Sequence, residues 1–102
     1  MDLKPGTKLR STVCTTEVVV IRAPSGPVDL ACGGSPMVPS ADAGEPTGKP
    51  APGFDHGTLL GKRYADEVIG IELLCSKAGD GSLSIDGEGL EPKGAKPLPA
   101  SD

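Results

Sequence analysis

Three cysteines and a single histidine carry most of the chemistry that this chain of 102 residues could perform. Cys14 and Cys32 flank the strongest strand signal in the sequence, whereas Cys75 lies in a separate apolar run. A free cysteine is commonly buried as a small apolar side chain, so we expect Cys75 in the core. His56 follows a segment rich in proline and glycine. The candidate functional residues are therefore Cys14 and Cys32, and His56 is considered as an additional ligand or as a catalytic partner of one thiol.

Cys14 and Cys32 permit several kinds of chemistry. They could form a disulfide, or hold a metal ion with help from His56, Glu17 or Asp86. They could also be two buried apolar side chains with no chemical role. A catalytic dyad of His56 with a thiol would need an orienting group and an oxyanion site, which no motif supplies. We therefore assign no catalytic residue, and name Cys14 and Cys32 as the candidate metal ligands.

A β-rich stretch, residues 9–38, must position these two thiols. Residues Glu17–Arg22 predict a strand, because four consecutive β-branched side chains favour a pleated, buried surface. The run does not alternate with polar residues, which indicates either that both of its faces are covered or that the run is too short to decide. Residues 28–32 predict the returning strand of a hairpin, with alternate residues on one face. The glycines of Cys32-Gly33-Gly34-Ser35-Pro36 predict a tight turn after it.

A segment rich in proline, glycine and alanine, residues 40–56, follows this stretch. Its composition predicts an irregular and mobile linker. Phe54 is its one large apolar residue and is expected to fasten its end to the folded part. Three further strands are expected beyond it, within residues 58–64, 68–75 and 83–85.

Residues 61–92 align with residues 8–39 without a gap. Both stretches pass in the same order through a strand, a glycine turn, a short strand, a second glycine turn, an apolar residue and a proline. A unit this small buries too little surface alone, so a duplication predicts two β units in pseudo-two-fold arrangement. The alternative is that any two β-hairpins would align in this way. The expected organisation is a first unit over 1–39, a linker over 40–56, a second, degenerate unit over 57–92 and a flexible tail over 93–102.

Two motifs flank the expected hairpin. Ser11-Thr12-Val13-Cys14 precedes it, and Cys32-Gly33-Gly34-Ser35-Pro36-Met37 follows it. They stand where desulforedoxin and the N-terminal domain of desulfoferrodoxin carry C-x2-C and C-C-G-x-x-M, which bind one metal ion. Residues 9–38 therefore resemble these small rubredoxin-like β units. The resemblance implies an all-β fold built from two desulforedoxin-like units, since desulforedoxin is a homodimer that a fused pair would match.

The chain departs from this family at the metal site. Two of the four ligand positions are occupied by Ser11 and Gly33. The same positions in the second copy hold no thiol, being Tyr64, Glu67, Ile85 and Asp86. Tetrahedral sulfur ligation of iron or zinc needs four thiolates, which one chain with three cysteines cannot supply. We therefore expect a vestigial site and no cofactor, with Zn or Fe held by Cys14 and Cys32 as the alternative.

Composition narrows the class of function further. The net charge is −4 and no basic run is present, which argues against nucleic-acid binding. No apolar run is long enough to span a membrane, and the N-terminus lacks the apolar region of a signal peptide, so a cytoplasmic location is expected. Only 36% of the residues are hydrophobic and only 2% are aromatic, which predicts a small core.

These observations predict a non-enzymatic accessory or interaction protein. It would bind a larger protein partner, or self-associate, through strand edges, the linker or the tail, because a chain with little core gains stability from a partner. The alternative is a redox or metal-binding protein that uses Cys14 and Cys32.

Overall fold

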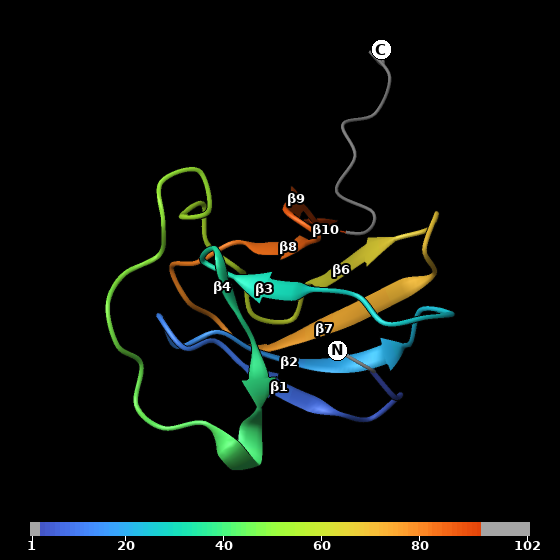
Figure 1. Ribbon diagram of the computed structural model, residues 1–102, viewed down its shortest axis with the longest axis horizontal. Coiled ribbons are helices and arrows are strands. Elements are labelled where there is room, and N and C mark those ends of the chain that lie inside the picture. The colour runs from blue at the N-terminus through green and yellow to red at the C-terminus, as the bar shows by residue number, and fades with distance from the viewer. Residues whose placement is uncertain (1–2, 93–102) are drawn as a thin grey trace.

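The computed structural model of the protein describes residues 3–92, which form two antiparallel β-sheets with no α-helix among them (Figure 1). The fold class expected from the sequence, all-β, is confirmed. The strands are β1 (Lys8–Arg10), β2 (Glu17–Arg22), β3 (Leu30–Cys32), β4 (Ser35–Pro36), β5 (Val38–Pro39), β6 (Arg63–Asp66), β7 (Ile71–Lys77), β8 (Leu83–Ile85), β9 (Glu88–Gly89) and β10 (Glu91–Pro92). A single 3-10 turn, η1, spans Ser40–Asp42. No helix within residues 3–92 has the length and apolar character needed to cross a membrane.

The larger sheet has the strand order β10-β6-β7-β2-β1-β5, and the smaller one has the order β4-β3-β8-β9. In both sheets the central pair joins the first half of the chain to the second. β2 pairs with β7 in the larger sheet, and β3 pairs with β8 in the smaller one. The smaller sheet lies over the larger one (Figure 1).

The core lies between the two sheets and consists mostly of aliphatic side chains and cysteines. Each sheet contributes the residues that point toward the other, among them Val18, Val20, Leu30, Cys32, Ile71, Leu73, Cys75, Leu83 and Ile85. The expectation that both faces of β2 are covered is wrong. Val18 and Val20 are buried, but Ile21 is 37% exposed, because only one face of the larger sheet packs against the smaller sheet.

The expected hairpin between residues 17–22 and 28–32 is also wrong. Both strands exist, but β2 belongs to the larger sheet and β3 to the smaller one. β1 and β7 occupy both edges of β2, so no edge remains for β3. The connection also contains Pro24 and Pro27, which cannot donate ladder hydrogen bonds. The chain therefore crosses from one sheet to the other between β2 and β3.

The two glycine-containing turns are confirmed. Cys32 pairs with Ser35 across a two-residue turn in which Gly33 and Gly34 have φ of +67° and +83°. Ile85 and Glu88 are joined in the same way through Asp86, whose φ is +51°, and Gly87. Two successive residues of positive φ match the twist of the flanking strands and give a tight β-hairpin.

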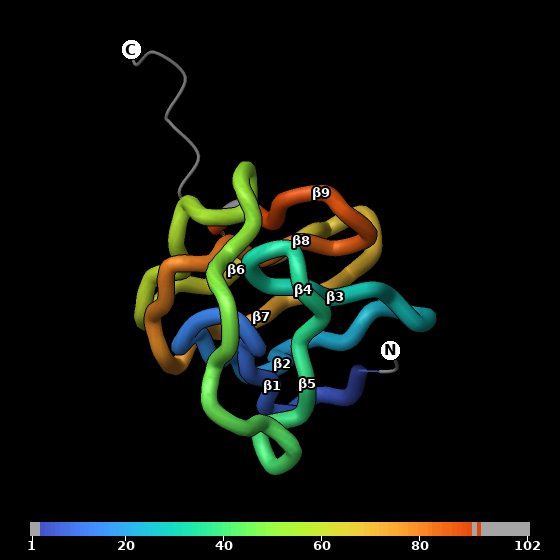
Figure 2. The backbone as a smooth tube through the Cα atoms, turned by 60° about the vertical axis from the view of Figure 1, so that its left-hand side comes forward, coloured from blue at the N-terminus to red at the C-terminus, as the bar shows by residue number. Residues whose placement is uncertain are grey.

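Residues 40–56 form a long connection across the outside of the molecule (Figure 2). Apart from η1 they have no regular secondary structure, as expected, but backbone hydrogen bonds attach them to the fold. The N–H of Thr47 donates to the carbonyl oxygen of Thr12, and that of Ala51 to Gly33 at 2.8 Å. The expected role of Phe54 at the end of this segment agrees with its carbonyl oxygen, which accepts the N–H of Ser82 at 2.7 Å. The tail expected over 93–102 lies outside the described residues.

Leu73 tests the location of the core, since it is fully buried at the centre of β7. Leu73→Ala is expected to lower the free energy of unfolding by about 2–5 kcal/mol, because it removes buried methyl groups and leaves a cavity. Urea denaturation measures the change. Val68→Ala is the control, since Val68 is 95% exposed, and its effect should stay within about 0.5 kcal/mol. Equal effects of the two substitutions would contradict this packing.

Candidate functional site

Cys14 and Cys32 meet inside the fold, with 3.8 Å between their Sγ atoms. Cys32 is the last residue of β3 in the smaller sheet and is completely buried. Cys14 lies in the loop that joins β1 to β2 at the end of the larger sheet, and is 9% exposed. The structure thus brings together the two thiols that the sequence singled out, from different sheets. All three cysteines are free thiols.

Local hydrogen bonds turn Cys14 toward the core. The hydroxyl oxygen of Ser11 accepts the N–H groups of Val13 and Cys14, at 3.1 and 3.2 Å. The N–H of Ser11 donates to the carbonyl oxygen of Thr16 at 2.9 Å, which closes the loop. Serine at the first position of such a turn supplies the acceptor that the backbone lacks. Ser11 is therefore a structural and polar neighbour of the thiol.

A glycine-rich segment from the second half of the chain, residues 78–82, covers Cys14; we call it the strap. The N–H of Gly81 donates to the Sγ of Cys14 at 3.4 Å. A Cβ at Gly81 would lie 3.1 Å from this sulfur and 2.9 Å from the nitrogen of Gly33. A Cβ at Gly79 would overlap the side chain and nitrogen of Thr16. Only glycine lets the strap backbone approach the thiol this closely.

Three hydrogen bonds fasten the strap, one from the exposed Thr15 and two from the buried Thr58 and Gly33. The hydroxyl of Thr15 donates to the carbonyl oxygen of Ala78, and that of Thr58 to the carbonyl oxygen of Gly81, each at 2.6 Å. The N–H of Gly33 donates to the carbonyl oxygen of Ser82 at 2.9 Å. The strap over Cys14 is therefore held by hydrogen bonds from the β1–β2 loop, from the β3–β4 turn and from Thr58, which pairs with Gly79 in an isolated β-bridge.

The pKa values of the two thiols are shifted in opposite directions. Burial raises the pKa of Cys14, but hydrogen bonds with Ser11, Thr16 and the N–H of Gly81 outweigh it and lower the pKa from 9.0 to about 7. The Sγ of Cys14 lies 3.3 Å from the Thr16 hydroxyl. Burial raises the pKa of Cys32 to about 11, and the adjacent Cys14 adds to the rise. At neutral pH the pair is thus one substantially ionised sulfur beside one protonated thiol.

These pKa values also make stability depend on pH, in opposite senses. The pKa of Cys14 is lowered on folding, so its contribution to stability is full above pH 9.0 and is lost as the pH falls through about 7. The pKa of Cys32 is raised, so its contribution is full below pH 9.0 and is lost as the pH rises through about 11.

Cys75 is in the core, as expected, and separate from this pair. It is 1% exposed in β7, and its Sγ donates to the carbonyl oxygen of Lys77 at 3.0 Å. Burial raises its pKa. Cys75 therefore stays a protonated thiol with a hydrogen-bond partner of its own.

The side chains considered as extra metal ligands lie elsewhere. Glu17 accepts a hydrogen bond from the Ser40 hydroxyl at 2.7 Å, and His56 is exposed beside Ser82, whose hydroxyl accepts its N–H. Asp86 accepts the N–H of Asp29 at 3.0 Å. Within residues 3–92, no three His, Cys, Asp or Glu side chains form a group that could hold a metal ion. Among the described residues, the site around Cys14 therefore consists of two thiols and the hydrogen-bonding groups next to them.

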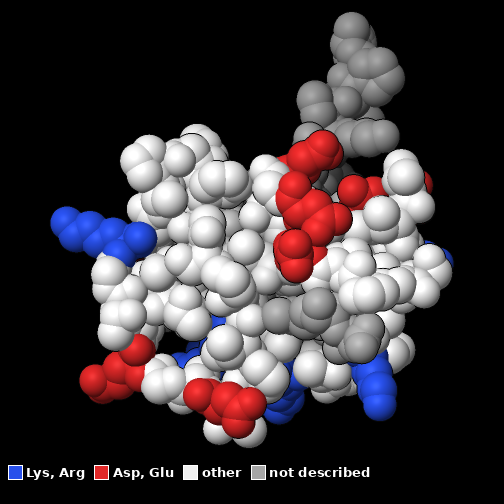
Figure 3. Space-filling view, viewed as in Figure 1, with Lys and Arg blue, Asp and Glu red and all other residues white. Residues whose placement is uncertain are grey.

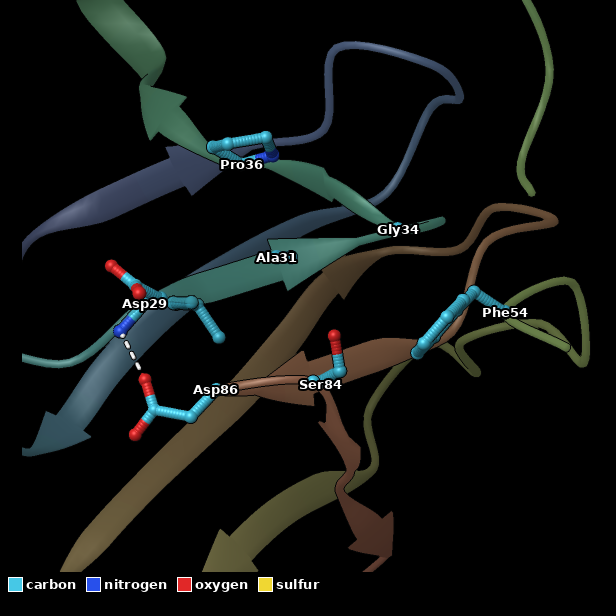
Figure 4. A pocket seen from close by; sticks show the side chains of 9 residues that line it. Asp29, Ala31, Gly34, Pro36, Phe54, Ser84 and Asp86 are labelled. Carbon is cyan, nitrogen blue, oxygen red and sulfur yellow. Dashed lines mark hydrogen bonds between the residues drawn. The ribbon is translucent and has the colours of Figure 1, made fainter.

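A second feature lies on the outer face of the smaller sheet. This hollow, which we call the Phe54 hollow, has a volume of about 670 Å³ (Figure 4). Its floor is shallow because the outward residues of β3 and β8 are small. Phe54 stands at one end and two exposed carboxylates at the other (Figure 4). The lining residues are Asp29, Leu30, Ala31, Gly34, Pro36, Phe54, Ser84, Asp86 and Gly87.

Ser84 gives the Phe54 hollow a polar group. Its side chain is 1% exposed and its hydroxyl has no hydrogen-bond partner within the described residues. The hydroxyl points from β8 into the space beside Phe54 (Figure 4). Acidic side chains gather over β8 and β9, and no Lys or Arg of the described residues lies beside them in this view (Figure 3). The hollow thus combines an aromatic wall, an unpaired hydroxyl and a negative rim.

Comparison with known proteins found no matching family model, no matching curated protein and no matching solved structure. The candidate site is therefore interpreted from its own geometry.

The sequence identified the two thiols but missed most of their neighbours. Ser11 entered only as a lost ligand position, and Thr16 and the strap glycines were not connected to Cys14. The one available signal was the repeated glycine in Gly79-Asp80-Gly81, which turn chemistry alone explains equally well. Contacts between residues so distant in the chain leave no local pattern that could have shown them.

Gly81→Ala tests the control of acidity by the strap. The new Cβ would press on Gly33 and Cys14 and move the Gly81 N–H away from the sulfur, so the pKa of Cys14 should rise from about 7 toward 9.0. Titration of the Cys14 Cβ resonance by 13C NMR measures it. Gly26→Ala is the control, because no atom lies within 4 Å of its Cβ position. An unchanged Cys14 titration in a folded Gly81→Ala protein would refute the role of the strap.

Proposed function

We propose that this protein is a small thiol redox protein in which Cys14 and Cys32 interconvert between two thiols and a disulfide. One observation carries the proposal: two buried sulfur atoms lie 3.8 Å apart. A disulfide bond is about 2.05 Å long, so closure needs the sulfurs to approach by less than the width of one atom. Cys32 is held in β3, so the β1–β2 loop that carries Cys14 is the part that would move.

The lowered pKa of one thiol and the raised pKa of the other favour formation of this disulfide. Disulfide formation needs one sulfur that reacts as a thiolate, and the lowered pKa of Cys14 favours that form at neutral pH. Cys32, with its raised pKa, remains a protonated thiol until its partner has been activated. Two buried apolar cysteines with no chemical role would not require the hydrogen bonds from Ser11, Thr16 and Gly81 that surround Cys14.

We further propose that the chain consists of two units in pseudo-two-fold arrangement, of desulforedoxin-like ancestry with a vestigial metal site. In support, strands β3, β4 and β5 shifted by 53 residues coincide with β8, β9 and β10. Each strand of the first half also has a counterpart at the mirror position of the same sheet. β2 faces β7, β1 matches β6 and β5 matches β10 in the larger sheet, and β3 and β4 match β8 and β9 in the smaller one. On this proposal the ancestral metal site has become a disulfide pair. Two of its four cysteine positions remain in the first unit, as Cys14 and Cys32, and none remains in the second.

Each reduced chain would then form one disulfide and would need to be reduced before it could react again. On this proposal the protein is a non-enzymatic component of the cytoplasm. Support for this location comes from its three free thiols, which are typical of reducing compartments.

Oxidation of the reduced protein with diamide should give one disulfide per chain, between Cys14 and Cys32, that dithiothreitol reverses. Peptide mapping by mass spectrometry locates the bond. Cys75→Ser should oxidise normally, whereas Cys32→Ser should form no intramolecular bond. The oxidised form should be more stable to urea by about 3 kcal/mol, as expected for the closure of a loop of this length. Recovery of three free thiols after treatment with diamide and, separately, with hydrogen peroxide would refute the proposal.

A second candidate function is binding of a protein partner, which the Phe54 hollow favours. Its negative rim and its unpaired Ser84 hydroxyl suit an extended segment that inserts a lysine side chain. The exposed Leu59 and Leu60, 57% and 65% accessible, lie in the turn before β6 and form a separate apolar surface.

A lysine-containing extended peptide is expected to shift the amide resonances of Ala31 and Ser84 in 15N-labelled protein. The same peptide with glutamate in place of lysine is the matched control, and should cause no such shift because of the acidic rim. Ala31→Leu should weaken binding several-fold, since the larger side chain fills the floor of the hollow. Equal shifts with both peptides would exclude this hollow as a lysine site.

A further inference from the structure

The hydrogen-bonded strap over Cys14 limits what can reach the thiol pair. Cys32 is completely buried and Cys14 is 9% exposed. The strap that covers the Cys14 sulfur is held by Thr15, Thr58 and the N–H of Gly33. A disulfide reagent such as oxidised glutathione must place both of its sulfurs in line with the attacking sulfur, which needs open space along that line. Hydrogen peroxide needs room for only two oxygen atoms.

Two groups around the Cys14 sulfur can donate to an anion there. The Thr16 hydroxyl accepts the Cys14 thiol proton at 3.3 Å and can donate in turn to the thiolate, and the N–H of Gly81 donates to the sulfur at 3.4 Å. Thr16 is completely buried, so its hydroxyl stays in place when a small molecule enters. Donors held in this way stabilise negative charge that develops on a departing oxygen.

We propose that the oxidant of this thiol pair is a small hydroperoxide, attacked by Cys14 and resolved by Cys32. This inference rests on the proposed function of the pair. In the first step the Cys14 thiolate attacks one peroxide oxygen, the O–O bond breaks, and Cys14 becomes a sulfenic acid while the other oxygen leaves as alkoxide or hydroxide and takes a proton from solvent. In the second step the Cys32 sulfur attacks the Cys14 sulfur, the S–OH bond breaks, and the Cys32 proton leaves with the hydroxide as water. Two electrons pass from the two sulfurs to the peroxide.

The acidities support this order of events. At pH 7 the lowered pKa of Cys14 favours its thiolate, whereas the raised pKa of Cys32 keeps that thiol protonated. A thiolate of low pKa is intrinsically the weaker nucleophile, but the larger ionised fraction outweighs this effect, so Cys14 is the attacking sulfur.

The test compares oxidants on the reduced full-length chain in the absence of air. Hydrogen peroxide should form the Cys14–Cys32 disulfide about tenfold or more faster than oxidised glutathione at equal concentration, because access differs. Cumene hydroperoxide, which is bulky, should also be slow. In Cys32→Ser a sulfenic acid should be trapped by dimedone on Cys14, whereas Cys14→Ser should give no adduct on Cys32. Trapping with dimedone in the unsubstituted protein keeps the test valid if either variant fails to fold.

Different outcomes overturn different claims. If diamide closes the disulfide but hydrogen peroxide is no faster than glutathione, the peroxide inference fails and the redox pair stands. A dimedone adduct on Cys32, or a stable glutathione adduct on Cys14, also overturns the inference. If no oxidant joins Cys14 to Cys32, the proposed function itself fails, and the peroxide inference fails with it.

Discussion

The pairing of β2 with β7 is the interaction on which the rest of the structure depends. It joins the two halves of the chain into one sheet and contributes Val18, Val20 and Leu73 to the centre of the core. β3 and β8 repeat the arrangement in the smaller sheet. Neither half has enough apolar residues to enclose a core alone, because large aromatic side chains are almost absent. The chain is therefore stable only when its halves are packed together.

The sequence predicted the features that depend on local chemistry. Strand β2 followed from its β-branched run, and the turns at Gly33-Gly34 and Asp86-Gly87 followed from residues that tolerate positive φ. The partners of the strands could not be predicted in this way. The same local signal is compatible with a hairpin of β2 and β3 and with the observed crossover. The choice between them depends on whether β7, about fifty residues away, takes the open edge of β2.

The candidate site shows the same division. Cys14 and Cys32 were identified by residue type and by the spacing of their motifs. Their chemistry depends on Thr16 and Gly81, and Gly81 comes from the other half of the chain. The N–H of Gly81 helps to lower the pKa of Cys14, and every residue except proline has such a group. The sequence therefore gives no sign of this effect. The Phe54 hollow likewise exists because the outward residues of β3 and β8 are small, a property that appears only when the two strands are paired.

Because the strap belongs to the second half, the thiol environment is assembled late in folding. Residues 1–39 contain Cys14 and Cys32 but lack Thr58, Gly79 and Gly81, so in a growing chain these two thiols have ordinary acidity. Only when β7 and β8 are in place does Cys14 acquire its donors. Pairings between residues this far apart in sequence form slowly. The lowered pKa of Cys14 is therefore a property of the fully folded chain.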